Sequence, residues 1–325
     1  METLESLELT PLSSDLARVE TALRVAVASS DRFLAEVATH LIDAGGKRVR
    51  PTLTLCAAYA AGSSTEPVPD EAITGAVACE LVQTGSLYHD DVIDEAETRR
   101  GVPSVNARWS NIVAILAGDY LLARASALAS SLGAEVASLL AWTIGELCRG
   151  QVLELQHLFD VDRSIEHYLS AIEGKTAALF GTSCRVGGMV CDGDAPTLDA
   201  LARYGHHLGM CFQIVDDCLD LTGTDQGLGK HAGQDLVEGV YTLPVLYALS
   251  ESDALRELLG RPLSPDSFQT ARAIAMSNGA IDAALAVARD HAVKAREALD
   301  GAERLDRDAR ASLRRLVDGL VDRSS

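Results

Sequence analysis

Apolar residues recur at helical spacing along almost the whole chain, and no segment alternates convincingly between apolar and polar residues as a β-strand would. Glycine and proline interrupt the pattern where turns are expected, for example at Gly45-Gly46 and around Pro67 to Pro69. The pattern predicts helices over residues 14–29, 30–43, 48–62, 70–95, 108–131, 134–157, 164–190, 197–222, 235–250, 252–259, 265–278, 280–299 and 302–321. We therefore expect an all-α fold, a single large bundle of about a dozen helices around a central cavity.

The composition favours one domain of close-packed helices. No linker rich in Pro, Gly or Ser divides the 325 residues, so one domain over 1–325 is expected, with a flexible N-terminus over residues 1–13. Hydrophobic residues make up 47% of the chain, which is ample for a core, and aromatic residues only 4%, which favours helices over a sheet. The N-terminus is acidic and leads into no apolar core, and no window approaches about eighteen apolar residues. We therefore expect no signal peptide, no stable membrane insertion and a cytoplasmic location.

The net charge of the chain limits the classes of partner that it is expected to bind. A net charge of −19 argues against nucleic acid and anionic membranes, because neither attracts a strongly acidic surface. The seven cysteines form no CxxC pair and no zinc spacing, so they are expected to be reduced residues of the core. The few clusters of basic residues therefore stand out.

The spacing DDxxD occurs twice, in HDDVID at 89–94 and in VDDCLD at 215–220. In each copy the first and last Asp lie four residues apart on one face of a helix, and the middle Asp lies about 100° round the axis. The two copies contribute six carboxylates: Asp90, Asp91, Asp94, Asp216, Asp217 and Asp220. Like charges at this spacing destabilise a helix, and a divalent metal removes the repulsion. Oxygen ligands without His or Cys indicate Mg²⁺ bridging carboxylates to substrate phosphates.

A plainer reading of one acidic run is a solvated helix face. Two copies, each at the end of an apolar helix, instead favour the rim of a pocket.

Basic residues lie close to these motifs. The stretch GGKRVRP at 45–51 leads into a helix, and Arg99-Arg100 follows the first acidic motif. Lys175-Thr176 lies inside an apolar helix, and Gly229-Lys230 follows the second motif. Each alone is explained by a solvated turn or a cation at a helix C-terminus. Together with the metal-binding acids, they indicate two anionic substrates, at least one of them a diphosphate.

The chemistry that fits is ionisation of an allylic diphosphate. No Ser/His/Asp arrangement, P-loop or GxGxxG is present, so hydrolase, kinase and dinucleotide-redox chemistry lack their usual residues. Apolar helix walls would shield a carbocation from water.

These motifs resemble those of trans-polyprenyl diphosphate synthases of the isoprenoid synthase superfamily, particularly the bacterial, actinobacterial medium- and long-chain members. The likeness spans about residues 40 to 250 and keeps the family's order: GGKRVRP, HDDVID with RRG, AGDYLLA at 117–123, GKTAALF at 174–180, YGHHLGMCFQIVDDCLD at 204–220, GK at 229–230, GQDL at 233–236 and TLP at 242–244. Single pieces are weak signals, but the ordered set is very specific.

The resemblance implies repeated condensation of isopentenyl diphosphate with an allylic diphosphate, in a homodimer. It implies that the six Asp residues bind three Mg²⁺ and the allylic diphosphate. Catalysis is assigned to Asp90, Asp91, Asp94, Lys175, Thr176, Gln213 and Asp216. The allylic diphosphate would be held by Arg99, Lys175 and Lys230, and the diphosphate of isopentenyl diphosphate by Lys47, Arg50 and Arg100. Thr176 and Gln213 would face the developing cation.

Two positions depart from the family pattern. Gln83 replaces a His that normally helps to bind isopentenyl diphosphate, and it can donate a hydrogen bond but carry no charge. Val240 replaces the Lys found in many members. The first change implies weaker or altered acceptor binding.

The length of the product depends on the floor of the cavity. Short-chain members carry an aromatic residue four or five positions before the first Asp, and here those positions are Ser86 and Gly85. Val82, deeper on nearly the same face, is also modest in size. We therefore expect a product of thirty to fifty carbons, with a geranylgeranyl diphosphate synthase as the alternative. Trp142, Phe180 or a partner subunit would then close the cavity lower down.

Two alternatives come from other classes. A class I terpene cyclase would keep the first acidic motif, but its second normally contains Asn and Ser, and it would not need Lys47 and Arg50. A non-catalytic regulatory subunit of a heteromeric synthase typically lacks one acidic motif, whereas both are intact here. Gln83 keeps the second alternative open.

Overall fold

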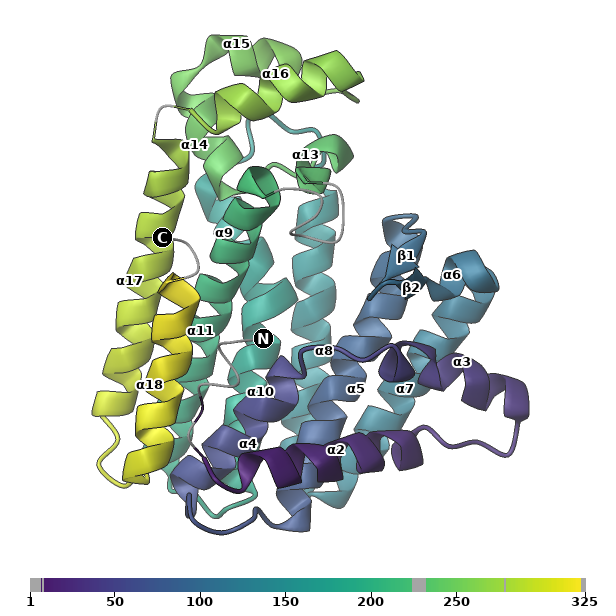
Figure 1. Cartoon of the computed structure of the whole chain (residues 1–325), viewed down its shortest axis with the longest axis vertical. Helices are drawn as coiled ribbons and strands as arrows, with labels where there is room; N and C mark the ends of the chain where they lie inside the picture. The colour runs from purple at the N-terminus through teal and green to yellow at the C-terminus, as the bar shows by residue number, and fades with distance from the viewer. Residues whose placement is uncertain (1–6, 8, 224–231, 278, 323–325) are drawn as a thin grey trace. The chain divides into compact units, whose positions relative to one another are not determined.

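Helices make up nearly all of the regular structure in the computed structural model, which describes residues 7, 9–223, 232–277 and 279–322 (Figure 1). The chain divides into two compact units, each built from more than one stretch of sequence. The first unit contains residues 1–144, 179–205 and 298–316, and the second contains 145–178, 206–297 and 317–325. The predicted all-α class is confirmed, and the single domain over 1–325 stays a prediction.

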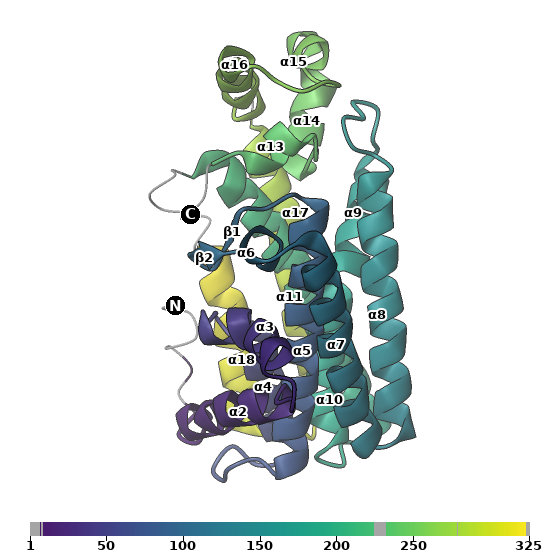
Figure 2. The same cartoon turned by 90° about the vertical axis from the view of Figure 1, so that its right-hand side faces the viewer.

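The first unit is built around a long central pair of helices. Its elements are α2 (Leu12–Ala26), α3 (Arg32–Asp43), α4 (Val49–Ala61), α5 (Asp70–Ile93), β1 (Thr98–Arg99), β2 (Val102–Pro103), α6 (Val105–Arg108), α7 (Asn111–Ser131), the beginning of α8 (Ala134–Leu155), most of α10 (Ala178–Met189), and parts of α11 (Ala195–Thr222) and α18 (Arg307–Asp322). Helices α5 and α7 run side by side (Figures 1 and 2). They approach closely because both carry glycine at the contact: a Cβ at Gly85 would meet the Gly118 carbonyl oxygen at 3.1 Å.

Helix α5 carries the first acidic motif at its C-terminal end. Asp70 and Glu71 occupy its first turn, where carboxylates interact favourably with the helix dipole. Its middle is buried, and the buried Tyr88 hydroxyl donates to the Val37 carbonyl oxygen at 2.7 Å. The helix ends at Ile93, so the motif lies where the chain leaves the core.

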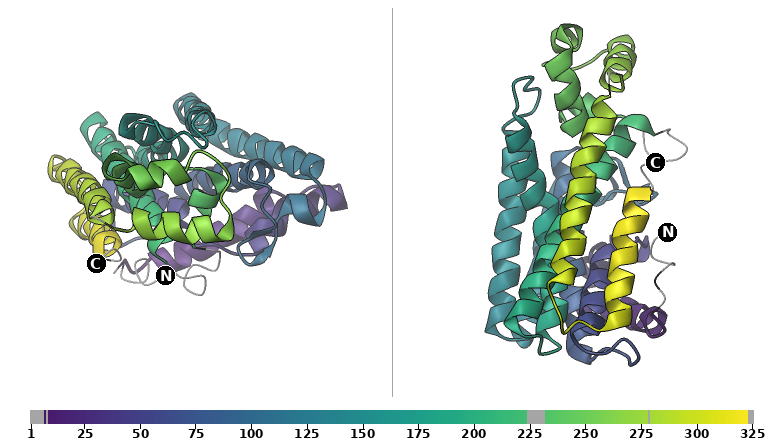
Figure 3. Two further views of the ribbon diagram at one scale, coloured as in Figure 1. Left: turned by 90° about the horizontal axis from the view of Figure 1, so that it is seen from above. Right: turned by 90° about the vertical axis from the view of Figure 1, so that its left-hand side faces the viewer.

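The second unit holds the second acidic motif and a cluster of short helices. It contains the end of α8, α9 (Ile165–Ile172), the π-helical turn η1 (Glu173–Ala177), the end of α11, α13 (Gln234–Glu238), α14 (Leu243–Glu251), α15 (Asp253–Leu258), α16 (Pro265–Ala275) and most of α17 (Ala280–Asp300). Helices α14, α15 and α16 pack against one another (Figures 1 and 3).

Several predicted helices are divided in the structure. The helix predicted over 108–131 begins later, as α7 at Asn111, with an N-cap at Ser110, whose hydroxyl accepts from the Val113 amide, and the short helix α6 precedes it. The segment 235–250 breaks at Gly239, which has a positive φ of 78°. The continuous helix predicted over 164–190 contains the π turn η1. Residues 98–103 form a two-stranded antiparallel hairpin that the sequence pattern did not indicate.

Some N-terminal residues are buried. Leu7, Leu9 and Leu12 are buried, and α2 begins at Leu12. The flexible N-terminus over residues 1–13 stays a prediction. Residues 1–6 and 8 lie outside the described part of the chain.

One helix meets the length and composition criteria of a membrane span. Among the described residues, α7 alone is long and apolar enough to cross a membrane by length and composition, with a mean hydropathy of 1.6. Core helices of globular proteins meet the same criteria, and α7 packs along α5 and carries Asp119 and Arg124. Only 33% of its apolar window is buried within the chain, and Ile112, Ile115 and Leu116 are exposed.

Candidate active site

The first acidic motif has graded exposure. Asp91 is fully buried, Asp90 is half-buried and Asp94 is exposed. Arg99, on the β1–β2 hairpin, reaches back to Asp91, with its Nε and Nη2 at 2.7 and 2.6 Å from Oδ1. Burial raises the pKa of the Asp91 carboxyl group, and Arg99 opposes that shift. The buried Oδ2 of Asp91 has no hydrogen-bond partner among the described residues.

The second acidic motif belongs to a hydrogen-bonded chain of side chains within the second unit. Asp217 is buried and accepts from the Tyr168 hydroxyl at 2.5 Å and from Gln213 Nε2 at 2.8 Å. Burial raises the pKa of Asp217 to about 7. The Thr176 hydroxyl donates to Gln213 Oε1 at 2.7 Å, which fixes the orientation of the amide from both ends.

The other two aspartates of this motif differ in exposure. Asp216 is exposed, whereas Asp220 is buried and accepts from the Asp235 amide at 3.3 Å. The end of α11 is therefore held against the beginning of α13.

The π turn η1 positions Lys175 and Thr176. Lys175 Nζ donates to Glu154 Oε1 of α8 at 2.6 Å, and Thr176 is buried. The backbones of α8 and η1 meet at two glycines, since a Cβ at Gly174 would lie 2.6 Å from the Glu146 carbonyl oxygen and one at Gly150 would also meet backbone atoms. Such π turns are frequent at functional sites because they redirect side chains within a helix.

The basic residues of the first unit gather around the turn that precedes α4. Lys47 is exposed, and Arg50 lies with its guanidinium 5.0 Å from the centre of the Phe180 ring. Burial lowers the pKa of Arg50 to about 10, and its buried Nε has no hydrogen-bond partner among the described residues. Arg100 donates from Nη1 to the Leu41 carbonyl oxygen at 2.6 Å. A half-buried guanidinium with a buried, unsatisfied N–H is suited to an incoming anion.

The positions predicted to set chain length all lie on α5. Val82 and Gly85 are buried, and Gly85 lies at the contact with α7. Ser86 is half-buried, and its hydroxyl donates to the Gln83 carbonyl oxygen at 2.9 Å. Gln83 is half-buried one turn after Glu80. Trp142 is 58% exposed, so within this chain it does not close an internal cavity, whereas Phe180 is buried.

The structure thus brings together the predicted residues within each unit. In the first unit, Arg99 contacts the first acidic motif. Lys47, Arg50 and Arg100 form a second group in that unit, around the turn before α4. The second gathers Thr176, Gln213 and Asp217. Lys230 lies outside the described residues.

The family model for polyprenyl synthetase matches residues 31–275 of this chain. The chain belongs to the polyprenyl synthetase family. Component 2 of the heptaprenyl diphosphate synthase of Geobacillus stearothermophilus is 42% identical, over 89% of this chain and 90% of that protein. The nonaprenyl diphosphate synthase of Mycobacterium tuberculosis is 40% identical, over 95% of this chain and 92% of that protein.

A solved structure from the polyprenyl synthetase family gives the same fold. The polyprenyl synthase of Caulobacter crescentus, crystallised with calcium and isoprenyl diphosphate, aligns with a TM-score of 0.90 at 34% identity and covers 98% of this chain and 99% of that one. The matches confirm the predicted resemblance to trans-polyprenyl diphosphate synthases, the isoprenoid synthase fold and the prediction of a prenyltransferase.

Three polar residues that support the site were not predicted from the sequence. Glu80 contacts Arg48 and Arg100, Glu154 pairs with Lys175, and Tyr168 bonds to Asp217. A glutamate inside the apolar run AVACELV was the available signal for Glu80. The contacts of Glu154 with Lys175 and of Tyr168 with Asp217 leave no local pattern in the sequence, because the partners are 21 and 49 residues apart.

A divalent metal fits the donors of the acidic motifs. All six are carboxylates, and the buried, unpartnered Oδ2 of Asp91 offers a coordination site. Among the described residues, no group of three carboxylate, imidazole or thiol side chains is gathered closely enough to hold a metal ion alone. Substrate phosphate oxygens would then complete the coordination, as is usual for Mg²⁺.

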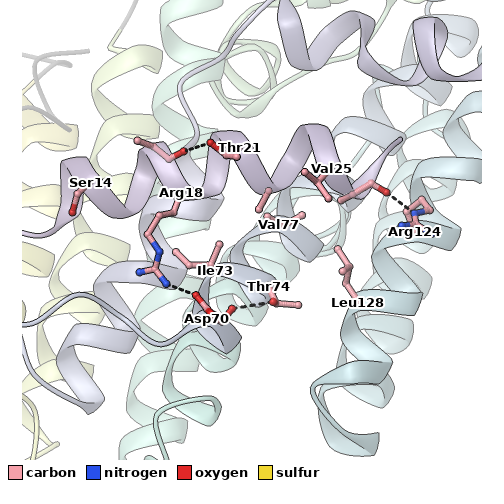
Figure 4. Close-up of a pocket in the computed structure, with 13 residues that line it drawn as sticks. Ser14, Arg18, Thr21, Val25, Asp70, Ile73, Thr74, Val77, Arg124 and Leu128 are labelled. Atoms are coloured by element: carbon pink, nitrogen blue, oxygen red, sulfur yellow. Dashed lines mark hydrogen bonds and ion pairs between the residues drawn. The ribbon is translucent and has the colours of Figure 1, made fainter. Parts of the chain in front are cut away.

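A separate groove of about 700 Å³ lies in the first unit between α2, α5 and α7 (Figure 4). Its walls are mostly apolar, with the Arg18–Asp70 ion pair at 2.5 Å and Arg124, which donates to the Ala26 carbonyl oxygen. None of the predicted site residues lines it.

Proposed function

We propose that this chain is a trans-polyprenyl diphosphate synthase that condenses isopentenyl diphosphate repeatedly with an allylic diphosphate. The observation that carries the proposal is that a member of the polyprenyl synthetase family keeps both DDxxD motifs together with the cations that accompany them. Each cycle lengthens the product by five carbons, and the product has all-trans geometry.

The allylic diphosphate is bound by Arg99, Lys175 and Lys230. Arg99 and Lys175 are already paired with Asp91 and Glu154, so their side chains are ordered before substrate arrives. Diphosphate oxygens exchange for these carboxylates, and charge-assisted hydrogen bonds hold the leaving group.

Magnesium is the metal that we assign to the carboxylates, with three ions per site. Asp90, Asp91, Asp94, Asp216, Asp217 and Asp220 would hold it. Bound Mg²⁺ would supply charge neutralisation of the departing diphosphate.

Isopentenyl diphosphate is bound by Lys47, Arg50 and Arg100, with Gln83 donating a hydrogen bond. The unpartnered, buried Nε of Arg50 supports this assignment, because binding an anion would satisfy it. Gln83 carries no charge, so its contribution is smaller than that of the His it replaces.

Thr176 and Gln213 stabilise the allylic cation. The Thr176 proton is engaged by Gln213 Oε1, so the lone pairs of the hydroxyl oxygen remain available to a positive charge. Gln213 donates in turn to Asp217, which orients the dipoles along one direction. The cation is attacked by the isopentenyl double bond, and the proton lost from the adduct passes to the departing diphosphate.

We assign a product of thirty to fifty carbons. Ser86 and Gly85 place no aromatic ring below the first motif, and Trp142 is exposed. The alternative product is the twenty-carbon geranylgeranyl diphosphate.

The assembly that we propose is a cytoplasmic homodimer that binds no nucleic acid. Helix α7 exposes Ile112 and Leu116, at 71% and 62%, on the face that also carries Ile115. An apolar stripe at this spacing is typical of a helix that packs against a partner. The net charge of −19 disfavours polyanionic partners.

A second candidate is one component of a heteromeric synthase, either catalytic or regulatory. The relative from Geobacillus stearothermophilus is named component 2 of such an enzyme, and Gln83 weakens the acceptor site of this chain.

The test is incubation of the purified full chain with Mg²⁺, isopentenyl diphosphate and, separately, the ten-, fifteen- and twenty-carbon allylic diphosphates, with products measured by mass spectrometry. A ladder that reaches thirty or more carbons supports the proposal. A ladder that stops at twenty supports the geranylgeranyl alternative. Absence of extension with every primer contradicts a self-sufficient synthase and favours the heteromeric candidate.

A further inference from the structure

Glu80 is a carboxylate buried in the middle of α5, only 2% exposed, beside the arginines assigned to isopentenyl diphosphate. Its Oε1 accepts from Arg48 Nη1 at 3.1 Å and lies 3.6 Å from Arg100 Nη2. Burying a carboxylate is costly unless cations compensate for the lost hydration, so this arrangement ties Glu80 to both guanidinium groups.

Arg48 is fully engaged within the protein. Its Nε donates to Glu20 Oε1 at 2.5 Å and its Nη2 to Glu20 Oε2 at 3.2 Å. Its remaining hydrogen bonds go to Glu80 and to the carbonyl oxygens of Ile42 and Gly45. Arg48 therefore holds the turn that carries Lys47 and Arg50 in place. All of its guanidinium N–H groups have partners within the protein, so none is left to bind a substrate.

Arg100 is held from two sides. Its Nη1 donates to the Leu41 carbonyl oxygen, and Glu80 lies beside Nη2. The turn passes directly over the guanidinium, since a Cβ at Gly46 would lie 3.0 Å from Arg100 Cζ. Glycine at 46, with a φ of 149°, permits this approach.

We propose that Glu80 is a positioning residue of the acceptor site, which fixes Arg100 and, through Arg48, the turn bearing Lys47 and Arg50, so that they meet the diphosphate of isopentenyl diphosphate. The inference rests on the proposed prenyl transfer. Glu80 touches no substrate atom and acts through the arginines.

Charge alone and positioning predict opposite effects of removing this carboxylate. Loss of a negative charge beside an anion site strengthens Coulomb attraction for the diphosphate and would lower the KM for isopentenyl diphosphate. Loss of positioning leaves Arg48, Arg50 and Arg100 repelling one another without their shared counter-ion, and raises that KM.

The experiment compares Glu80→Gln with Glu20→Gln in the full chain. Glu20 is a matched control, because among the described residues it pairs with Arg48 and Arg24 but not with Arg100. The KM for isopentenyl diphosphate is measured at saturating fifteen-carbon allylic diphosphate and Mg²⁺, and the KM for the allylic substrate at saturating isopentenyl diphosphate. Binding of isopentenyl diphosphate to the metal-free protein is measured by calorimetry as a readout independent of turnover.

The expected result is a rise of about tenfold or more in the acceptor KM and Kd of Glu80→Gln. The allylic KM and kcat of both variants stay within about twofold of wild type. The acceptor KM and Kd of Glu20→Gln, which loosens Arg48 but not Arg100, rise less than those of Glu80→Gln. An acceptor KM that is unchanged or lower in Glu80→Gln overturns the inference, as does an equal rise in Glu20→Gln.

Glu80→Asp covers the case in which Glu80→Gln does not fold. It keeps the charge but withdraws the carboxylate by about one methylene, so a raised acceptor KM supports positioning and an unchanged one contradicts it. If the wild-type protein extends no primer, that result contradicts the proposed function and not the positioning role of Glu80. The calorimetric comparison then still decides whether Glu80 positions the anion site.

Discussion

At the scale of single residues, the proposed site is organised before substrate binds. Arg99 forms an ion pair with Asp91, and Lys175 forms one with Glu154. The Tyr168 hydroxyl donates a hydrogen bond to Asp217. Buried charges are stable only when they are paired and hydrogen-bonded, so each cation and carboxylate keeps a defined orientation. Binding of a diphosphate is therefore an exchange of partners rather than the ordering of flexible side chains, which lowers its entropic cost.

Chain length is the property that a single residue tests best. Ser86→Phe is expected to shorten the longest product relative to wild type, because an aromatic ring fills the space below the first motif. Gly85 is less suitable, since any Cβ there presses on the Gly118 carbonyl oxygen. Trp142→Ala is the control, because that side chain is 58% exposed, and it should leave the ladder unchanged. Mass spectrometry of the products measures both, and an unaltered ladder from Ser86→Phe would show that the floor lies elsewhere.

At the scale of elements, close backbone contacts and short irregular segments place the chemistry. Gly150 and Gly174 let α8 and η1 touch, and the π turn directs Lys175 and Thr176. The β1–β2 hairpin returns Arg99 to the end of α5. These devices interrupt otherwise regular helices where the site is built.

Helices α11 and α17 contact each other through a pair of histidines. The Nδ1 atoms of His207 and His291 lie 3.2 Å apart, an arrangement in which one ring donates to the other and protonation of both would place like charges in contact. Burial, with help from Lys294 and His206, lowers the pKa of His291 from 6.5 to about 4.

The unfolded chain therefore takes up a proton at His291 at a higher pH than the folded protein does. Stability from this group is full above the unfolded pKa of 6.5 and is lost as the pH falls towards about 4. We expect the melting temperature to fall from pH 7 to pH 5, and to fall less in His291→Gln, as measured by circular dichroism. His40→Gln, on α3, is the control variant. Equal pH slopes for wild type and His291→Gln would contradict this assignment.

At the scale of the whole molecule, the apolar outer face of α7 is the feature that calls for a partner. In Ile112→Asp combined with Leu116→Asp, charges replace apolar side chains in the proposed interface, so the protein is expected to shift from dimer to monomer and lose most of its activity. Light scattering coupled to size exclusion measures the mass. Val25→Asp is the matched control, since Val25 is 69% exposed on α2. A monomeric wild type would contradict the homodimer, and an equal effect of Val25→Asp would contradict this interface.

The sequence by itself determined the helical class, the family and the types of residue in the site. Helical periodicity and the motifs DDxxD, GGKRVRP and GKTAALF are local, so they can be read without knowing the fold. Family membership from these motifs was confirmed, whereas the roles of individual residues stay predictions.

Only the tertiary structure decided which groups support that chemistry and how. The π turn at 173–177, the hairpin at 98–103 and the division of the helix predicted over 235–250 depend on close packing with distant segments, which periodicity does not encode. Glu80, Glu154 and Tyr168 acquire their roles only from partners brought near by folding. Arg48 and Arg50 are two residues apart in one motif, yet their neighbours in the fold differ. Arg48 is bonded to Glu20 and Glu80 and holds the turn in place, whereas the buried Nε of Arg50 has no hydrogen-bond partner among the described residues.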